Sequence, residues 1–196
     1  GCFFYFIAMA LISTLTNLGR FATSTVSLAG AVASVLAPQG GTVVVGKDTR
    51  ISGYMFESAL EAALVASGLD VMLLGPFPTP AISFTTKDCN ANFGVIISAS
   101  HNSYEYNGLK ILNSLGEKID KRIEIDIENQ LSKDPITHTA DTLGRATRNP
   151  DARGNYMNFI SEIFTQPQPF KNIKVVVDCS HGAAYKIAPR MLSALG

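Results

Sequence analysis

Ser100, His101 and Asn102 are the residues of this chain whose types and spacing best suit chemistry. They come shortly after Gly94–Ile97, an apolar run that predicts a buried strand, so the serine hydroxyl would lie near a strand end beside an imidazole and an amide. A serine in such a place can act as a nucleophile or carry a phosphoryl group. These residue types more often cap and turn a loop, and the Gly-x-Ser-x-Gly pattern of the hydrolase nucleophile elbow is absent. The chemical role is therefore a hypothesis that other polar segments have to support.

Two other polar segments offer charged side chains to such a serine. Asn107 and Lys110 follow the serine loop closely. A lysine there could hold an anion or transfer a proton if its surroundings lower its pKa, although most lysines are simply exposed. Asp48 and Arg50 follow another apolar run, Thr42–Val45, in a loop that lacks the full Walker A pattern. These residues predict a site made of cations and a carboxylate rather than a P-loop.

The apolar runs that precede these loops predict a parallel sheet. Thr42–Val45 and Val71–Leu74 have the composition of buried strands, and residues 54–67 between them have the apolar spacing of an amphipathic helix. A strand, helix and strand in this order form a crossover unit whose strands are parallel. Because ligands in open α/β sheets collect at the carboxyl ends of strands, we expect the loops 46–53 and 98–103 to lie side by side.

The rest of the chain predicts an α/β fold in two parts. Residues 1–148 are expected to form a three-layer domain with a mostly parallel mixed sheet between helices, and residues 149–196 the start of an incomplete second α/β domain. The proline-rich segment 75–81 is expected to have no regular structure, since proline lacks an amide donor and restrains the residue before it. The polar segment 133–150 is expected to be a linker. Further expected elements are a hairpin near 109–116, helices over 23–36, 123–131, 156–164 and 185–195, and a buried strand over 174–178.

Charge and cysteine content exclude several classes of protein. Sixteen basic and sixteen acidic residues give a net charge of zero, so no net field attracts nucleic acid or an anionic membrane. We therefore expect no nucleic-acid partner and no membrane partner. The three cysteines are odd in number and far apart, without a Cys-x-x-Cys pair, which favours a reducing, cytoplasmic location.

Residues 1–12 form an apolar run that resembles the hydrophobic part of a signal peptide. The run has no initiating Met and no basic stretch before it. It is also shorter than the roughly 20 residues that span a bilayer. We interpret it first as an aberrant or fragmentary start, and keep a buried element and a true signal or anchor as alternatives. Residues 1–22 as a whole are atypical of the domain that follows.

Several stretches of the chain, in order, resemble the α-D-phosphohexomutase family. The stretches are Val45–Tyr54, Gly75–Ile82, Gly94–Asn102, Asn107–Lys110 and Lys174–Ala183. The resemblance covers residues 40–196, and its loops are closest in wording to the bacterial members that act on glucosamine phosphate. It implies the family's first domain followed by the start of its second.

The resemblance implies a role for each residue of the loops. Ser100 would be phosphorylated and its phosphate would help to bind Mg²⁺, while Lys110 would assist proton transfer and His101 would shape the catalytic loop. A phosphate adds about −1.5 to −2 charge, which makes nearby cations and a divalent metal physically sensible. Support for the substrate and the loop would come from Asp48, Arg50, Asn102 and Asn107.

The implied reaction interconverts glucosamine 6-phosphate and glucosamine 1-phosphate for the synthesis of amino-sugar and cell-wall precursors. The phosphoserine would give its phosphoryl group to the sugar monophosphate, and the sugar bisphosphate, both intermediate and activator, would return the other one. Mannose or glucose phosphate is the alternative substrate. The alternative from another class is a non-catalytic, membrane-tethered interaction module that uses residues 1–12.

Some parts of the family pattern are not matched. The family's opening Gly-Thr-Asp-Gly-Ile-Arg-Gly loop has no counterpart in residues 1–40, and Ser103 stands where proline is usual. The family's aspartate-rich Mg²⁺ loop, sugar-selecting loop and phosphate-binding last domain would lie beyond Gly196. Ser100 is then the one obvious metal ligand, and we expect the chain alone to be inactive. The sequence leaves the oligomeric state open.

Overall fold

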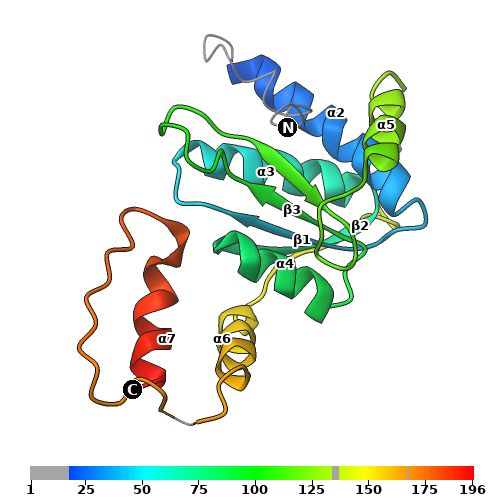
Figure 1. The fold of residues 1–196 in the computed structure, drawn as a ribbon. Coiled ribbons are helices and arrows are strands. Elements are labelled where there is room, and N and C mark those ends of the chain that lie inside the picture. The colour runs from blue at the N-terminus through cyan, green and yellow to red at the C-terminus, as the bar shows by residue number, and fades with distance from the viewer. Residues whose placement is uncertain (1–17, 134–136, 167) are drawn as a thin grey trace.

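The apolar runs of the sequence form the middle of one five-stranded sheet (Figure 1). The computed structural model describes residues 18–133, 137–166 and 168–196. The order of the strands is β4-β3-β1-β2-β5, with β4 antiparallel to β3 and the other neighbours parallel. The strands are β1 (Gly41–Lys47), β2 (Leu69–Pro76), β3 (Phe93–Ile97), β4 (Leu109–Leu112) and β5 (Ala146–Arg148). The predicted mostly parallel mixed sheet is confirmed.

Helices cover both faces of this sheet, as a three-layer α/β domain requires. Three helices lie on one face and α4 lies on the other (Figure 1). Helix α5 begins where the side chain of Asp120 accepts a hydrogen bond from the backbone of Ile123 at 2.9 Å, and α3 ends before Gly68, which has a φ of +78°. The helices are α2 (Leu18–Leu36), α3 (Ser52–Ala66), α4 (Thr79–Asp88) and α5 (Lys121–Gln130).

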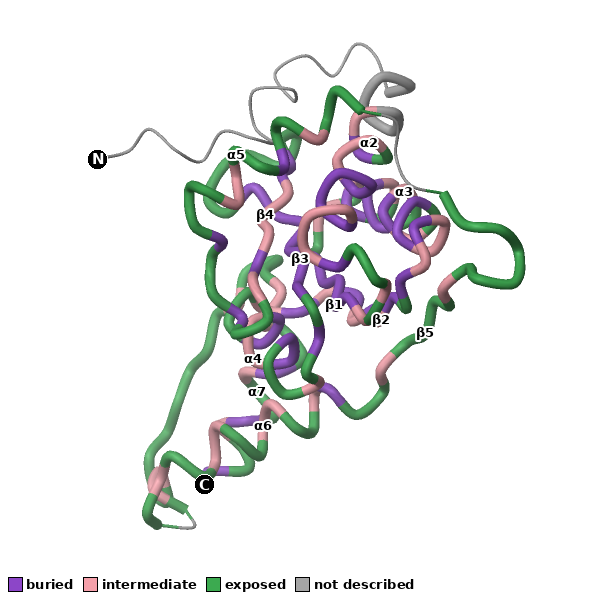
Figure 2. Tube along the Cα trace, turned by 90° about the vertical axis from the view of Figure 1, so that its right-hand side faces the viewer, coloured by how far each residue is buried: buried purple, intermediate pink, exposed green. Residues whose placement is uncertain are grey.

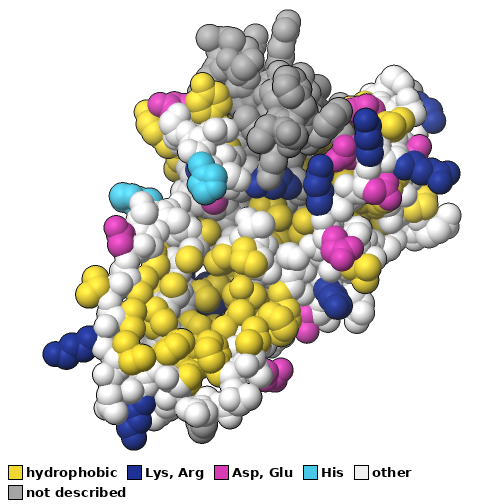
Figure 3. Space-filling view, viewed as in Figure 1, with side chains coloured by type: hydrophobic (Ala, Val, Ile, Leu, Met, Phe, Trp, Pro, Cys, Tyr) yellow, Lys and Arg dark blue, Asp and Glu magenta, His cyan; other side chains and the backbone are white. Residues whose placement is uncertain are grey.

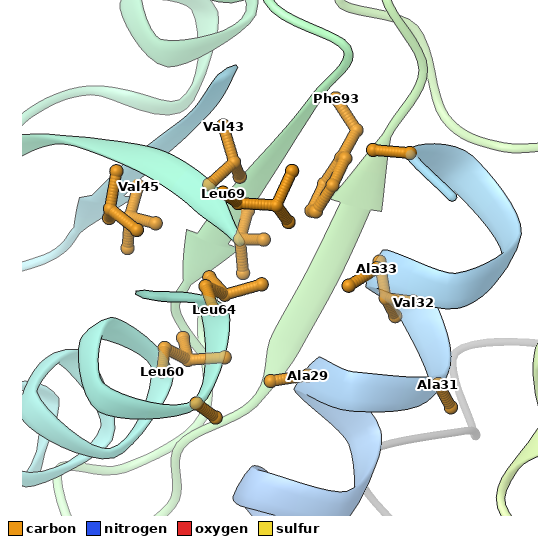
Figure 4. Packing of buried hydrophobic residues seen from close by; sticks show 14 of the residues in the cluster. Ala29, Ala31, Val32, Ala33, Val43, Val45, Leu60, Leu64, Leu69 and Phe93 are labelled. Carbon is orange, nitrogen blue, oxygen red and sulfur yellow. The ribbon is translucent and has the colours of Figure 1, made fainter. Parts of the chain in front are cut away.

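The central strand β1 is apolar without interruption because it is covered on both faces. Val43 and Val45 pack with α2 and α3 in one apolar cluster (Figure 4), while Val44 faces a second cluster with Ile82 and Ile96. Side chains of a strand alternate between the two faces, so a run of valines fills both cores. Full burial of such a side chain contributes about 1.5–3 kcal/mol. This packing on both faces holds β1 and β3 in place beneath the loops that follow them.

The expectation that residues 75–81 lack regular structure is wrong. β2 continues to Pro76, and α4 begins at Thr79 with Pro80 in its first turn. The first turn of a helix tolerates proline, because its amide would have no partner within the helix and its φ already suits helical backbone. The prolines therefore mark the start of a helix that the sequence did not predict.

The linker expected over residues 133–150 is also wrong in part. Residues 146–148 form β5, which pairs in parallel with β2 at the edge of the sheet. This strand is exposed and polar, so it lacks the apolar pattern by which buried strands are predicted. The expected hairpin near 109–116 is confirmed as β4 followed by a turn that closes with a single bridge between Leu112 and Lys118.

The C-terminal part consists of α6 (Ala152–Glu162), a short 3-10 helix η1 (Ala183–Lys186) and α7 (Ala188–Ala194). Helix α6 packs on α4 through stacked rings of Phe84 and Phe159, whose centroids lie 4.6 Å apart. The predicted helices in this part are confirmed with shifted ends. The domain boundary at residue 149 stays a prediction.

The buried strand expected over residues 174–178 is wrong. This run pairs with no strand among the described residues, and Val176 is 99% exposed. Figure 2 shows the exposed chain between α6 and α7, and Figure 3 shows apolar side chains gathered around a hollow in this region. The run has the composition of a strand, but a strand needs a neighbour to satisfy its backbone.

None of the helices in the described ranges is long and apolar enough to cross a membrane. The interpretations of the apolar run at residues 1–12 concern residues outside the described ones.

Candidate active site

The two loops expected to meet do so at the carboxyl ends of β1 and β3. The strands are parallel neighbours, and the amide of Asp48 donates to the carbonyl of Ile97 at 3.0 Å just beyond their last shared pair. The loop after β1 therefore begins against the loop after β3. The expected neighbourhood of loops 46–53 and 98–103 is confirmed, although β1 continues to Lys47 and α3 already begins at Ser52.

Arg50 holds the serine loop through its backbone. The guanidinium donates to four carbonyls, those of Ser100 at 3.0 Å, Asn102 at 2.8 Å, Tyr106 at 2.9 Å and Ser103. A guanidinium offers five N–H donors in a fixed planar fork, so one side chain can satisfy several carbonyls of a segment without secondary structure. We call this set of contacts the Arg50 clamp.

Asp48 orients the clamp from the opposite side. Its Oδ2 atom accepts from Nε of Arg50 at 2.9 Å, and its Oδ1 atom accepts from the Arg50 amide at 3.1 Å. The pair is partly buried, so water competes less with it than with a surface ion pair. Asp48 and Arg50 thus form one unit, in which the carboxylate directs the guanidinium at the serine loop.

Ser98 links Asp48 to Ser100 by two hydrogen bonds. Its hydroxyl donates to Oδ2 of Asp48 at 2.7 Å and accepts from the amide of Ser100 at 3.0 Å. The sequence did not single out Ser98 as a functional residue, since serine in a loop usually turns the backbone. The signal that could have found it is a buried serine directly after an all-apolar strand, where a polar group needs a partner.

Ser100 faces the amine of Lys110. Nζ of Lys110 donates to Oγ of Ser100 at 2.6 Å, and Lys110 reaches it from β4, the antiparallel neighbour of the strand that carries the serine. Burial lowers the pKa of Lys110, and the negative charge of Asp48 opposes this effect. A lysine with a lowered pKa is better suited to exchange a proton with the serine oxygen.

Ser100 adopts a backbone conformation that non-glycine residues rarely have. Its φ is +55°, in the left-handed region. The amide is held by Ser98 and the carbonyl by Arg50, so the contacts on both sides stabilise this conformation. The strained backbone therefore lies at Ser100, the residue whose hydroxyl has to point toward Lys110.

The other predicted site residues, His101, Asn102 and Asn107, differ in their exposure and in their contacts. His101 is exposed, and its side chain makes no hydrogen bond to the described part of the chain. Asn102 takes part through its backbone, accepting from Arg50 and donating to the carbonyl of Ala99 at 3.2 Å. Asn107 is buried, and its amide donates to the hydroxyl of Ser52 at 3.0 Å. Asn107 therefore connects the end of the serine loop to the start of α3.

One contact links the site to the C-terminal part. The hydroxyl of Thr49 donates to the carbonyl of His181. That carbonyl belongs to a turn in which the amide of Ser180 donates to Asp178 at 2.7 Å. The turn that follows the run 174–178 thus reaches the loop of the Arg50 clamp.

The residues described do not form a metal site by themselves. Among residues 18–133, 137–166 and 168–196, no three His, Cys, Asp or Glu side chains come together to hold an ion. The carboxylate of Asp48 is already bonded to Arg50 and Ser98. A divalent ion takes about six oxygen ligands, so ligands beyond those described would have to complete a Mg²⁺ site.

Comparison with known sequences places these features in a family. The sequence model for phosphoglucomutase/phosphomannomutase, alpha/beta/alpha domain I, matches residues 17–137. Phosphoglucosamine mutase of Shewanella oneidensis is 50% identical over 154 residues, which are 79% of this chain and 35% of that protein. The enzyme of the same name from Teredinibacter turnerae is 49% identical over 173 residues, 86% of this chain and 38% of that protein. The chain spans just over a third of the length of these relatives.

Solved structures have the same fold. A phosphoglucomutase/phosphomannomutase family protein from Burkholderia thailandensis matches with a TM-score of 0.72 and 27% identity, over 89% of this chain and 38% of that one. Parafusin from Paramecium matches with a TM-score of 0.71 and 17% identity, over 96% of this chain and 40% of that one, which is a likeness of fold.

Proposed function

The chain belongs to the phosphoglucomutase/phosphomannomutase family, and we propose that it supplies the phosphoryl-carrying serine of a phosphoglucosamine mutase. The enzyme would interconvert glucosamine 6-phosphate and glucosamine 1-phosphate through a phosphoserine and a sugar bisphosphate. The observation that carries this proposal is the 2.6 Å contact between Lys110 and Ser100, in a loop whose backbone the Arg50 clamp holds.

Lys110 is proposed as the proton donor and acceptor for the serine oxygen. When the phosphoryl group leaves Oγ of Ser100, the sugar hydroxyl loses its proton as its oxygen bonds to phosphorus. The serine oxygen left behind gains a proton, which the amine 2.6 Å away can supply. When the bisphosphate returns a phosphoryl group, the neutral amine takes the proton of the attacking serine hydroxyl. The lowered pKa of Lys110 supports this exchange, because it brings the two protonation states closer in energy.

Arg50 is proposed to act by positioning. Its terminal nitrogens donate to the backbone carbonyls of the serine loop, so Arg50 fixes the orientation of Ser100. Phosphoryl transfer needs the attacking and leaving oxygens nearly in line, and catalysis depends mainly on position and charge. His101, exposed beside Ser100, is available to the incoming sugar phosphate.

Mg²⁺ is proposed to bind at the phosphorylated Ser100. The phosphate on Ser100 would offer oxygen ligands, and the ion would neutralise charge on the phosphoryl group when bound. Since the described residues do not complete a metal site, the remaining ligands would come from outside them. We therefore propose that the 196-residue chain alone does not interconvert sugar phosphates. The cytoplasmic location belongs to the same proposal.

The phosphoserine can be tested by mass. The chain is incubated with glucose 1,6-bisphosphate and its intact mass is compared with that of Ser100→Ala and, as a matched control, Ser103→Ala. We expect one added phosphoryl group on the parent and on Ser103→Ala, and none on Ser100→Ala. Equal labelling of Ser100→Ala would contradict the assignment. If no form is labelled, the same three substitutions are compared in a protein of the relatives' full length that includes this chain, called the longer protein below.

The choice of sugar can be tested in the longer protein. Turnover of glucosamine 6-phosphate is compared with that of mannose 1-phosphate and glucose 1-phosphate. We expect the highest kcat/KM for the amino sugar, as the names of the relatives suggest. A preference for mannose or glucose phosphate would replace this substrate while leaving the role of Ser100 intact.

A further inference from the structure

Beneath the Arg50 clamp lies a buried ion pair that the proposed reaction does not use. Nζ of Lys47 is 2.5 Å from Oε2 of Glu57, and the two side chains are only 1% and 7% exposed. The ammonium also lies over the ring of Tyr54, 3.3 Å from its centroid. Lys47 is the last residue of β1 and Glu57 lies on α3, so the pair joins the two elements on either side of the clamp loop.

Stability alone does not explain a charged pair in this place. Removing two charges from water costs several kcal/mol per ion in general, and apolar residues of similar volume often replace a buried pair without loss. A buried lysine and glutamate do, however, hold two elements at a short distance, because separating them would leave two buried charges uncompensated.

The position of the pair links it to the clamp. Lys47 directly precedes Asp48, and Arg50 follows two residues later. The aliphatic part of Lys47 passes under Gly53, where an added Cβ atom would lie 3.4 Å from Cδ of the lysine. The loop that carries Asp48 and Arg50 runs from the end of β1 to the start of α3. A rotation of α3 against β1 would therefore change the distance and direction between the two ends of this loop.

A second contact holds the start of α3 from the β4 side of the sheet. Asn107, just before β4, donates to Ser52 in the first turn of α3. β1 and β4 flank β3, the strand that leads to Ser100. The first turns of α3 thus contact residues of β1 and residues just before β4, the two neighbours of the strand that leads to Ser100. On the outer side, Arg148 of β5 approaches Oε1 of Glu57 at 3.9 Å.

We propose that Lys47 and Glu57 are positioning residues of the active site. The pair sets the angle between β1 and α3, and through it the Arg50 clamp on the Ser100 loop. The inference rests on the proposed function only where activity is concerned, since the placement of Arg50 can be measured in the chain itself.

The test replaces the pair by apolar side chains of similar volume in Lys47→Met/Glu57→Leu. Thermal unfolding is measured together with the ¹⁵N NMR signal of the Arg50 Nε–H group, which is bonded to Asp48 at 2.9 Å. We expect a Tm within about 5 °C of the parent, because both charges are removed together. We also expect the Arg50 Nε–H to exchange with solvent about tenfold faster or more, as its contacts open locally.

A matched control removes an ion pair of the same residue types far from the site. Lys118 and Glu124 lie 3.1 Å apart, with the lysine 65% exposed. Lys118→Met/Glu124→Leu should leave the Arg50 signal unchanged. If the Lys47→Met/Glu57→Leu chain folds and its Arg50 signal matches that of this control, the proposal is overturned. If the chain does not fold, Glu57→Gln decides in the same way, since it keeps the shape of the side chain and removes its charge.

Activity gives an independent readout in the longer protein. For Lys47→Met/Glu57→Leu we expect kcat to fall roughly 100-fold with KM little changed, since a displacement of about 1 Å at the reacting group can cost this much. Unchanged kcat would overturn the proposal. If the unsubstituted longer protein does not interconvert sugar phosphates, the proposed function fails, and the Arg50 signal still decides whether the pair positions the clamp.

Discussion

Nζ of Lys110, which lies in β4, is 2.6 Å from Oγ of Ser100, which lies in the loop after the antiparallel neighbour β3. Lys110 stands opposite Ile96 on β3, so its side chain has to reach along that strand to the serine loop. The contact exists because the Arg50 clamp and Ser98 turn Ser100 back toward β4. Each of these groups can be changed separately, which gives the following predictions.

The lowered pKa of Lys110 predicts how its replacement changes the pH dependence of stability. Burial disfavours the charged amine in the folded chain, so between the lowered pKa and the ordinary value of 10.5 the unfolded chain binds more protons. Stability from this group therefore rises as pH rises through that window. Lys110→Met should be at least as stable as the parent at pH 7, and the difference should narrow toward pH 10. Thermal unfolding of the parent and of Lys110→Met across this range checks it, and a difference in Tm that does not change with pH would contradict it.

Arg50→Lys keeps the charge of the clamp and removes its planar fork. An ammonium cannot reach four carbonyls and a carboxylate at once, so we expect the serine loop to lose about 1–3 kcal/mol of local stability. Hydrogen exchange of the amides between residues 100 and 106 should become faster. Arg122→Lys on the exposed side of α5 is the matched control and should leave these amides unchanged. Equal protection in both variants would show that the carbonyl contacts do not hold the loop.

Ser98 and Ser100 are predicted to differ although they are two residues apart. Ser98→Ala removes one donor to Oδ2 of Asp48, which keeps its contacts with Arg50, and leaves the Ser100 amide without an acceptor, so it should cost about 1–3 kcal/mol. Ser100→Ala removes the hydroxyl that accepts from Lys110 on an exposed residue, so it should cost less, about 0.5–1 kcal/mol. Urea unfolding of the two variants gives both values. The reverse order would mean that Ser98 does not connect the two loops.

The sequence predicted those elements whose pattern follows from burial. β1, β2 and β3 are apolar because helices cover both faces of the sheet, and this pattern is visible without a structure. β5 is held by backbone pairing at an exposed edge, so its side chains carry no signal. The run 174–178 has the composition of a buried strand, yet burial depends on a neighbour that the run itself does not encode.

The candidate site was predictable to a similar degree. Ser100 and Arg50 could be named because polar residues after buried strands meet at one edge of a parallel sheet, and Lys110 because it follows the serine loop closely and matches the family's motif. Ser98 and the pairing of Lys47 with Glu57 could not be predicted from residue type, because a serine normally turns a loop and charged residues are normally solvated. Only the positions of their partners reveal that these side chains are buried inside the structure.

The close approach of α4 to β3 gives a last prediction, because β3 leads to the serine loop. A Cβ atom on Gly94 would lie 2.3 Å from Oγ1 of Thr86, whose side chain is fully buried and bonded to the carbonyl of Ile82 at 2.9 Å. Thr86 is stiff at χ1 and cannot turn away easily. Gly94→Ala should therefore destabilise the chain by about 1–3 kcal/mol.

A double-mutant cycle separates this clash from the loss of glycine itself. Thr86→Ala removes the atom that the new methyl group would meet, so Gly94→Ala should cost clearly less in the Thr86→Ala background, with a coupling of about 0.5–3 kcal/mol. Gly154→Ala on α6 is the matched control, because nothing lies within 4 Å of its added Cβ atom. That substitution should be neutral or stabilise the helix by up to about 1 kcal/mol. Additive effects of Gly94→Ala and Thr86→Ala in urea unfolding would mean that α4 moves freely away from the sheet.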